Sequence, residues 1–248
     1  MHELQEMLSR EPTNILREIS PKDIQYKVNP DLSYYLSAGR SALRCIRLAL
    51  LTAGRGDPKS ILDLPCGHER VLRTLKAAFP SARLTACDLD HDSVEFCCQA
   101  FGATPVYSRV DPVEIPLNGL FDLIWVGSLL THLDYPRWIP FLARFQELLT
   151  IGGVLVFTTH GRFVADRLRT REFTYGLSPE TIHSLVERFQ STGFGYQQYP
   201  SQDNYGISLS TPAWVCSQLA ATEKLQLVNY TEKGWNQHQD VVACRKSK

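Results

Sequence analysis

Short apolar runs and segments of helical periodicity alternate along most of this chain. Residues 61–64 form a mainly apolar run that is too short for a helix, and residues 71–79 then show the apolar spacing of a helix. Pro65 and Gly67 lie between the two segments and indicate a tight turn. The stretch therefore predicts a strand, a short loop and a helix, which is the repeating unit of parallel α/β sheets.

The same unit recurs, and the pattern predicts an α/β fold with a doubly wound, mostly parallel sheet. We expect parallel strands over residues 61–64, 83–88, 105–110, 121–126 and 154–159, and helices over 31–51, 71–79, 92–101 and 137–149. A turn at 151–153 separates the last of these helices from the fifth strand. Residues 224–230 and 239–244 alternate in polarity and predict a closing antiparallel hairpin. Seven strands result.

An insertion and an N-terminal arm complete the predicted organisation. Within residues 162–223 we expect an irregular, Arg-rich segment over 162–176, a helix over 178–190, a short hairpin over 196–209 and a helix from 211 to 221. Residues 1–30 hold one possible helix at 4–8, and the proline-rich remainder is either a lid or an ordered arm. We interpret the chain as one domain made of an arm and helix (1–56), a core (57–161), the insertion (162–223) and the hairpin (224–248).

Composition and charge exclude several functional classes. Lys plus Arg and Asp plus Glu each number 26, so no net charge favours a nucleic acid partner. The sequence shows no signal peptide and no segment of transmembrane length, which predicts a cytoplasmic protein. The seven cysteines lack paired spacing, so we expect neither a disulfide framework nor a metal site. Nothing in the composition indicates an oligomeric state.

Polar residues or glycines follow the predicted parallel strands at their carboxyl ends. Because these ends meet at one edge of a parallel sheet, we expect one cleft lined by Gly67, Asp88, Asp111, Ser128 and His160. Asp88 follows Gly67 at the interval of about 20 residues at which such folds place an acid on a ribose hydroxyl. The single glycine of the loop argues against a pyrophosphate ligand, which needs closer backbone approach. The alternative interpretation is that Asp63 and Asp88 only cap helices.

These features resemble the class I S-adenosylmethionine-dependent methyltransferases, over residues 35–160 by motif and 224–245 by strand pattern. The resemblance implies a Rossmann-like fold, S-adenosyl-L-methionine as cofactor and S-adenosyl-L-homocysteine as product. It implies cofactor contacts at Asp63, Pro65, Cys66, Gly67, Asp88, Leu89, Asp111, Val126, Gly127 and Ser128, and no metal. The loop departs from the family pattern, since Pro65, His68 and Glu69 occupy positions that usually hold glycine or flexible residues. Segments 127–133 (GSLLTHL) and 158–161 (TTHG) are also similar to a bacterial group often found beside glycosyltransferases.

A sulfonium methyl group is already activated, so catalysis depends mainly on positioning the acceptor and excluding water. A hydroxyl acceptor also needs a base, and we expect His160 in that role because it ends the fifth strand. His132 either contacts the substrate or packs beside the methionine pocket. His238 either pairs with Asp240 as a base or is a hydrogen-bonded side chain of the hairpin.

Two groups in the insertion have a functional and a structural interpretation. Arg162, Arg167, Arg169 and Arg171 either clamp an anionic acceptor or form a solvated face. Tyr196, Tyr199, Tyr205 and Trp214 either stack on a sugar or aromatic acceptor or form the core of the insertion.

The predicted function is therefore an S-adenosylmethionine-dependent methyltransferase that acts on a small-molecule or glycan acceptor, most plausibly on a hydroxyl. The alternatives are a catalytically silent partner protein of the same fold and an N-methyltransferase of a small molecule or protein. We expect residues 162–223 to form the acceptor side of the cleft.

Overall fold

The computed structural model describes Leu8 and residues 10–200 and 202–248 of the chain. Its main sheet has seven strands in the order β3-β2-β1-β4-β5-β9-β8. These strands are β1 (Ser60–Asp63), β2 (Arg83–Asp88), β3 (Thr104–Tyr107), β4 (Phe121–Val126), β5 (Leu149–Thr159), β8 (Leu225–Trp235) and β9 (Gln239–Lys246). Strands β1 to β5 pair in parallel, whereas β9 is antiparallel to both β5 and β8. The predicted doubly wound fold with a C-terminal hairpin is confirmed.

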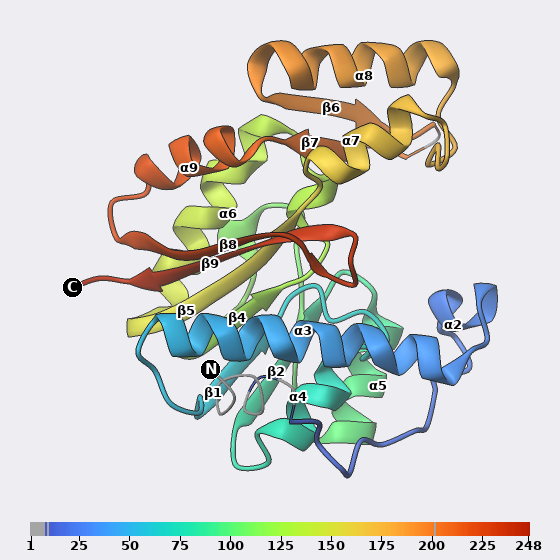
Figure 1. Cartoon of the computed structure of the whole chain (residues 1–248). Coiled ribbons are helices and arrows are strands. Elements are labelled where there is room, and N and C mark those ends of the chain that lie inside the picture. The colour runs from blue at the N-terminus through green and yellow to red at the C-terminus, as the bar shows by residue number, and fades with distance from the viewer. Residues whose placement is uncertain (1–7, 9, 201) are drawn as a thin grey trace.

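Helices cover both faces of the sheet, as Figure 1 shows. One face packs against α3 (Leu32–Thr52), α4 (Leu72–Ala78) and α5 (His91–Phe101). The other face packs against α6 (Tyr135–Leu148) and α9 (Pro212–Ala220). Since successive residues of a strand point to opposite faces, Ile61 joins the first core and Leu62 the second. This double cover leaves the carboxyl edge of the sheet free to build a site.

The insertion forms a small unit with its own apolar core. It contains α7 (Arg162–Arg169), α8 (Pro179–Thr192) and a two-stranded antiparallel sheet of β6 (Phe194–Gln198) and β7 (Gly206–Ser210). Hydrogen bonds join β7 to the main domain. Ser210 N donates to His160 O (2.9 Å), and Ser208 Oγ donates to Leu130 O (2.8 Å) in the short helix η2 (Leu130–His132). Strand β7 is therefore fixed over the ends of β4 and β5.

The N-terminal arm is attached to the helix that follows the first strand. Arg73 of α4 is 1% exposed, forms an ion pair with the buried Glu69, and donates to Leu16 O and Glu18 O at 2.7 Å each. Burial raises the pKa of Glu69, and the charge of Arg73 opposes that shift. The arm continues into the exposed helix α2 (Ile24–Val28). The helix expected over 4–8 lies, except for Leu8, outside the described residues.

Three element predictions are wrong in detail. Residues 162–169 are helical, because Val164, Ala165 and Leu168 share one buried face. Strand β5 begins at Leu149 and runs through the expected turn, where Gly152 adopts a positive φ of 78°. Strand β3 ends at Tyr107, and the 3-10 helix η1 (Pro112–Glu114) follows.

Among the described helices, none combines the length and apolar character that a membrane span requires.

Candidate functional site

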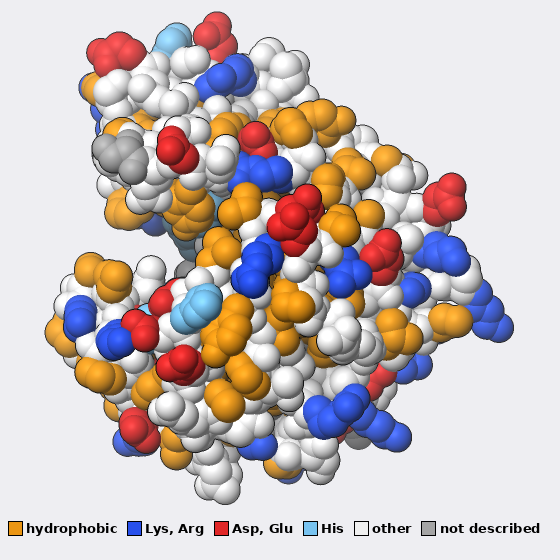
Figure 2. Space-filling view, turned by 180° about the vertical axis from the view of Figure 1, so that it is seen from behind, with side chains coloured by type: hydrophobic (Ala, Val, Ile, Leu, Met, Phe, Trp, Pro, Cys, Tyr) orange, Lys and Arg blue, Asp and Glu red, His pale blue; other side chains and the backbone are white. Residues whose placement is uncertain are grey.

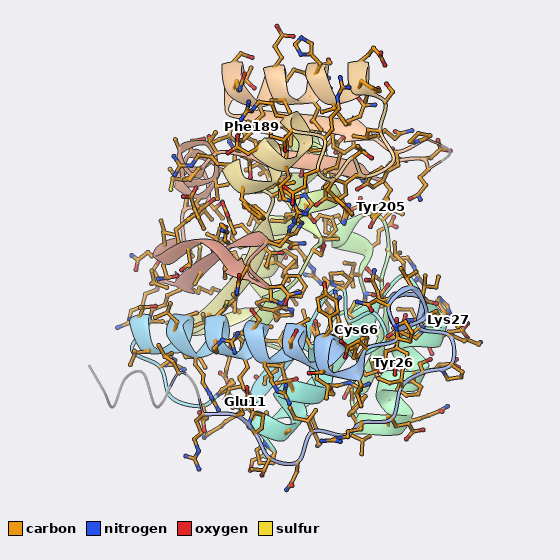
Figure 3. All side chains as sticks on the ribbon, turned by 45° about the vertical axis from the view of Figure 1, so that its right-hand side comes forward. Glu11, Tyr26, Lys27, Cys66, Phe189 and Tyr205 are labelled. Carbon is orange, nitrogen blue, oxygen red and sulfur yellow. The ribbon has the colours of Figure 1, made fainter. Side chains whose placement is uncertain are left out.

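A cavity of about 580 Å³ lies at the carboxyl edge of the sheet. Its volume is in the range of about 300–1,000 Å³ that is typical of small-molecule sites. Figure 2 shows the corresponding notch on the left of the molecule, below the part that carries the insertion. Residues 63–68, 70 and 71, at the end of β1 and in the segment after it, form one wall, and residues 203–205 of the β6–β7 hairpin form the opposite wall. In Figure 3, Tyr205 lies above the cavity and Cys66 below it.

The loop after β1 presents bare backbone to this cavity. Gly67 has a φ of +49°, and a Cβ atom built on it meets no other atom within 4 Å. Its N–H donates to Asp88 Oδ2 (2.8 Å), while Asp90 N donates to Asp88 Oδ1 (3.0 Å). Burial raises the pKa of Asp88, and the two backbone donors oppose that shift. The carboxylate is thus oriented at the cavity wall with acceptor capacity remaining on both oxygens.

Asp63 is a second acid beside the cavity, at the end of β1. It is 1% exposed, and neither carboxylate oxygen has a hydrogen-bond partner among the described residues. Burial, together with the charge of Asp88, raises the pKa of Asp63 well above its ordinary value. A positively charged ligand in the cavity would favour the ionised form of this acid.

The wall next to β3 differs from the prediction. Ser108, Arg109 and Val110 line the cavity, whereas Asp111 is exposed and caps η1 by accepting a hydrogen bond from Val113 N (2.9 Å). The expected place of Asp111 in the cleft is therefore wrong, because β3 ends four residues before it. The pair Asp111-Pro112 is itself a helix-start signal that could have revealed this.

Three of the predicted cofactor contacts, Val126, Gly127 and Ser128, lie at the end of β4. Gly127 and Ser128 line the cavity, but Val126 is fully buried and packs in the core on the α6 face. A Cβ atom on Gly127 would lie 2.8 Å from Trp125 Nε1, so the indole of Trp125 requires glycine there. Pro65, Cys66 and Leu89 also line the cavity, as expected.

His132 is the one histidine of the three predicted catalytic candidates that lines the cavity. Its Nδ1 lies 2.7 Å from the backbone oxygen of Gly206. Because a carbonyl oxygen only accepts, Nδ1 carries the proton and Nε2 has a free lone pair. Burial lowers the pKa of His132, which favours this neutral form. The ring of Tyr205 stacks on the imidazole with centroids 4.5 Å apart.

His160 lies behind His132 and does not line the cavity. It is 2% exposed, and its ring centroid is 6.2 Å from that of His132 and 5.7 Å from that of His238. Burial and the two neighbouring histidines lower its pKa well below the ordinary value. The expectation that His160 reaches the cleft is wrong, because β7 covers the end of β5.

His238 also lies outside the cavity lining and binds the hydroxyl of Tyr175 through Nε2 (2.7 Å). Asp240 accepts instead from Tyr230 Oη (3.0 Å) and Lys233 N (2.9 Å). These contacts match the interpretation of His238 as a hydrogen-bonded side chain of the hairpin, and no His238–Asp240 pair forms among the described residues.

The charged and aromatic groups of the insertion mostly have structural partners. Arg162, Arg167 and Arg169 form ion pairs with Glu232, Glu172 and Asp166, respectively. None of the four predicted arginines lines the cavity. Trp214 stacks on Phe194 with centroids 4.3 Å apart, and among the four aromatic candidates only Tyr205 lines the cavity.

Sequence reasoning missed several residues of the cavity wall. They include Asp23, Ile24 and Gln25 of the arm and α2, Tyr35 of α3, Arg70 of the loop after β1, Ser108 to Val110, Arg137 of α6, and Asp203 and Asn204 of the hairpin. Only Ser108 carried a signal, since it directly follows a strand.

Comparison with known proteins shows that part of the chain is similar to methyltransferases. Residues 62–155 match the family described as methyltransferase domain. Malonyl-[acyl-carrier protein] O-methyltransferase from Anoxybacillus flavithermus is 29% identical over 126 residues, which cover 50% of this chain and 48% of that protein. The enzyme of the same name from Hahella chejuensis is 30% identical over 161 residues, which cover 55% and 57%. The chain therefore spans about half the length of the curated relatives it matches.

Solved structures agree with the family match at the level of the fold. The N-methyltransferase NodS from Bradyrhizobium japonicum, in complex with S-adenosyl-L-homocysteine, has a TM-score of 0.54 and 17% identity, with 100% of this chain and 98% of that chain covered. The 1,6-didemethyltoxoflavin-N1-methyltransferase from Burkholderia thailandensis has a TM-score of 0.58 and 18% identity, with 90% and 84% covered. The chain therefore has the Rossmann-like fold of these methyltransferases.

These similarities imply S-adenosylmethionine as cofactor, and the residues of the cavity fit it. The bare backbone at Gly67 leaves room for a ligand, and the Asp88 carboxylate has the acceptor capacity that ribose hydroxyls require. The uncompensated acid Asp63 suits a ligand that carries a positive sulfonium. One glycine is sufficient here because the cofactor has no pyrophosphate.

Proposed function

We propose that the protein is an O-methyltransferase that uses S-adenosylmethionine to methylate a hydroxyl of a small-molecule acceptor, with His132 as the base. One observation carries the proposal: His132 lines the cavity with Nδ1 bound to Gly206 O and Nε2 free to accept a proton. A hydroxyl is a poor nucleophile until its proton is removed, and a positioned neutral imidazole supplies the acceptor for that proton.

The cofactor contacts follow the order of the strands. Asp88 would hold the ribose hydroxyls, and Leu89 and residues 108–110 would enclose the adenine beside β3. Gly127 and Ser128 would lie under the methionine end, beside β4. When bound there, the cofactor supplies an activated methyl group.

The residues of the chain itself then have three tasks. The loop after β1 and residues 127–128 orient the donor, and Tyr205 covers one face of His132. Nε2 of His132 takes the proton of the acceptor hydroxyl, and Gly206 O stabilises the imidazolium that results. We propose His132 instead of His160 as the base because His160 is buried behind it.

The names of the relatives support oxygen as the accepting atom, since they specify O-methylation of malonyl-[acyl-carrier protein] and, in Mycolicibacterium smegmatis, of a fatty acid. Of the four aromatic residues considered for stacking on a glycan acceptor, only Tyr205 lines the cavity. A carboxylate acceptor would arrive ionised and would need no base, so it would not depend on His132.

The test is titration calorimetry with S-adenosylmethionine and S-adenosylhomocysteine, followed by mass spectrometry of products from an acceptor screen. We expect binding in the micromolar range, about 8 kcal/mol, and a product methylated on oxygen. Binding without any product across the screen would support the silent partner protein. A product methylated on nitrogen would overturn the O-methyltransferase proposal.

A further inference from the structure

Arg70 lines the cavity and has no described partner for its charge. We propose that Arg70 binds the carboxylate of the cofactor's methionine moiety. The inference rests on the proposed function, because it takes S-adenosylmethionine as the ligand of the cavity. It assigns a cofactor-binding residue that the motif of the loop does not indicate.

The contacts of Arg70 differ from those of the other arginines in the cavity wall. Arg109 donates to Ser108 O (3.0 Å), and Arg137 donates from Nε to Asp134 Oδ1 (2.5 Å). The structure shows no hydrogen bond and no ion pair from Arg70 to any described residue. A guanidinium has five N–H donors and no acceptor. The half-buried Arg70 therefore has donors available for a planar anion such as a carboxylate.

The position of Arg70 indicates that the methionine end of the cofactor, and not the adenine end, would lie beside it. Its guanidinium carbon lies 5.7 Å from the centre of the Trp235 ring, and that ring lies 5.4 Å from the ring of Trp125 in β4. Asp88 lies on the other side of β1, at the end of β2. A ligand whose ribose lies at Asp88 and whose adenine lies toward β3 therefore extends its amino acid part toward β4 and Arg70.

The charges around Arg70 favour a zwitterion over a simple anion. The same cavity is lined by five acids, namely Asp23, Asp63, Asp88, Asp90 and Asp203. A free anion would be repelled by them, whereas a methionine moiety offers its carboxylate to Arg70 and its positive groups to the acids. The guanidinium lies over the Trp235 ring, and its planar fork of N–H groups suits a bidentate contact with a carboxylate.

The experiment compares two ligands that differ in this one group. S-adenosylhomocysteine carries the amino acid part, and 5′-methylthioadenosine lacks it. We expect R70A to weaken S-adenosylhomocysteine by about 10- to 100-fold and to change 5′-methylthioadenosine by less than about 2-fold. R70K keeps the charge but loses the planar fork, so we expect an intermediate loss. R83A is the matched control, because Arg83 is exposed at the start of β2 and does not line the cavity.

Each outcome has one meaning. Equal affinity of wild type and R70A for S-adenosylhomocysteine, with 5′-methylthioadenosine still bound, would overturn the role of Arg70 and leave the proposed function intact. Equal loss of both ligands in R70A would also overturn it, because the residue would then support the loop and not the carboxylate. If the wild type bound neither ligand, the proposed function itself would fail.

Discussion

His132 Nδ1 lies 2.7 Å from Gly206 O, so the segment after β4 is bonded to the first residue of the insertion strand β7. This contact joins the cofactor-binding core to the part of the chain that forms the opposite wall of the cavity. It also sets which nitrogen of His132 carries the proton. The geometry of the insertion and the chemistry of the proposed base are therefore linked through one hydrogen bond.

The first prediction concerns His132→Asn, which keeps an amide donor for Gly206 O but removes the base. We expect turnover to fall by about 10²- to 10⁴-fold while the affinity for S-adenosylhomocysteine stays nearly unchanged. In the wild type, turnover should persist somewhat below pH 6.5 and then fall, because the pKa of His132 is lowered by burial and the protonated ring cannot act as a base. Steady-state kinetics across pH 5 to 9 measure both effects.

The control for this prediction is His183→Asn, on the exposed face of α8. It should leave turnover and its pH profile unchanged. Near-normal turnover of the His132 variant on the true acceptor would show that this residue is not the base.

The second prediction concerns acid stability and His160. Its pKa is lowered in the folded protein by burial, so the unfolded state binds the proton more readily. His160 therefore reduces the free energy of unfolding as the pH falls below about 6.5, the ordinary pKa of histidine. We expect His160→Gln to lose less stability than the wild type between pH 7 and pH 5.

Urea denaturation at the two pH values gives the difference, and His183→Gln serves as the control for an exposed histidine. Comparing variant with wild type removes the contributions of the buried acids, which both proteins share. An equal loss of stability in the two proteins would contradict the assignment of His160 as a buried neutral side chain.

The sheet was predictable because each strand leaves a strong local pattern, but the depth of individual residues in the site was not. His132 and His160 illustrate the difference. Both follow strands in the sequence, yet β7 covers the end of β5 and hides His160, and this packing depends on Ser208 and Ser210, far away in the chain. A strand end fixes which edge a residue approaches, whereas a later segment decides whether it stays accessible.

Asp111 shows a second kind of error, in a boundary. The predicted third strand extends three residues beyond Tyr107. The polar residue expected in the cleft after this strand was therefore Asp111 instead of Ser108. Strand ends without a glycine or proline carry little local signal, so the period-two pattern alone could not set this one. The residues that replace glycine in the loop after β1, in contrast, did carry structural information. One of them, Glu69, stabilises the fold through its ion pair with Arg73.

The third prediction uses that ion pair. Arg73→Met leaves Glu69 without its cationic partner in a buried position, and removing one partner of such a pair costs about 3–5 kcal/mol. It also removes the two bonds that hold Leu16 and Glu18. We expect a clear fall in Tm and faster limited proteolysis within residues 10–20.

Lys22→Met is the matched control, because its ion pair with Asp92 is exposed and such pairs contribute about 0–1 kcal/mol. If both variants melted at the wild-type temperature, the Glu69–Arg73 pair would not anchor the arm.

The last prediction separates Asp88 from Asp111, two acids that the sequence placed in the same cleft. Asp88 lines the cavity and is oriented by Gly67 N and Asp90 N, whereas Asp111 is exposed at the start of η1. Asp88→Ala should weaken S-adenosylhomocysteine by about 1.5–3 kcal/mol, because a charge-assisted hydrogen bond to the ribose is lost. Asp111→Ala should leave the affinity unchanged and lower stability by about 0.5–2 kcal/mol through loss of the cap. Calorimetry and thermal denaturation of both variants test the pair: equal loss of affinity in the two would mean that the cofactor reaches beyond Val110, and no loss in either would remove Asp88 from the cofactor site.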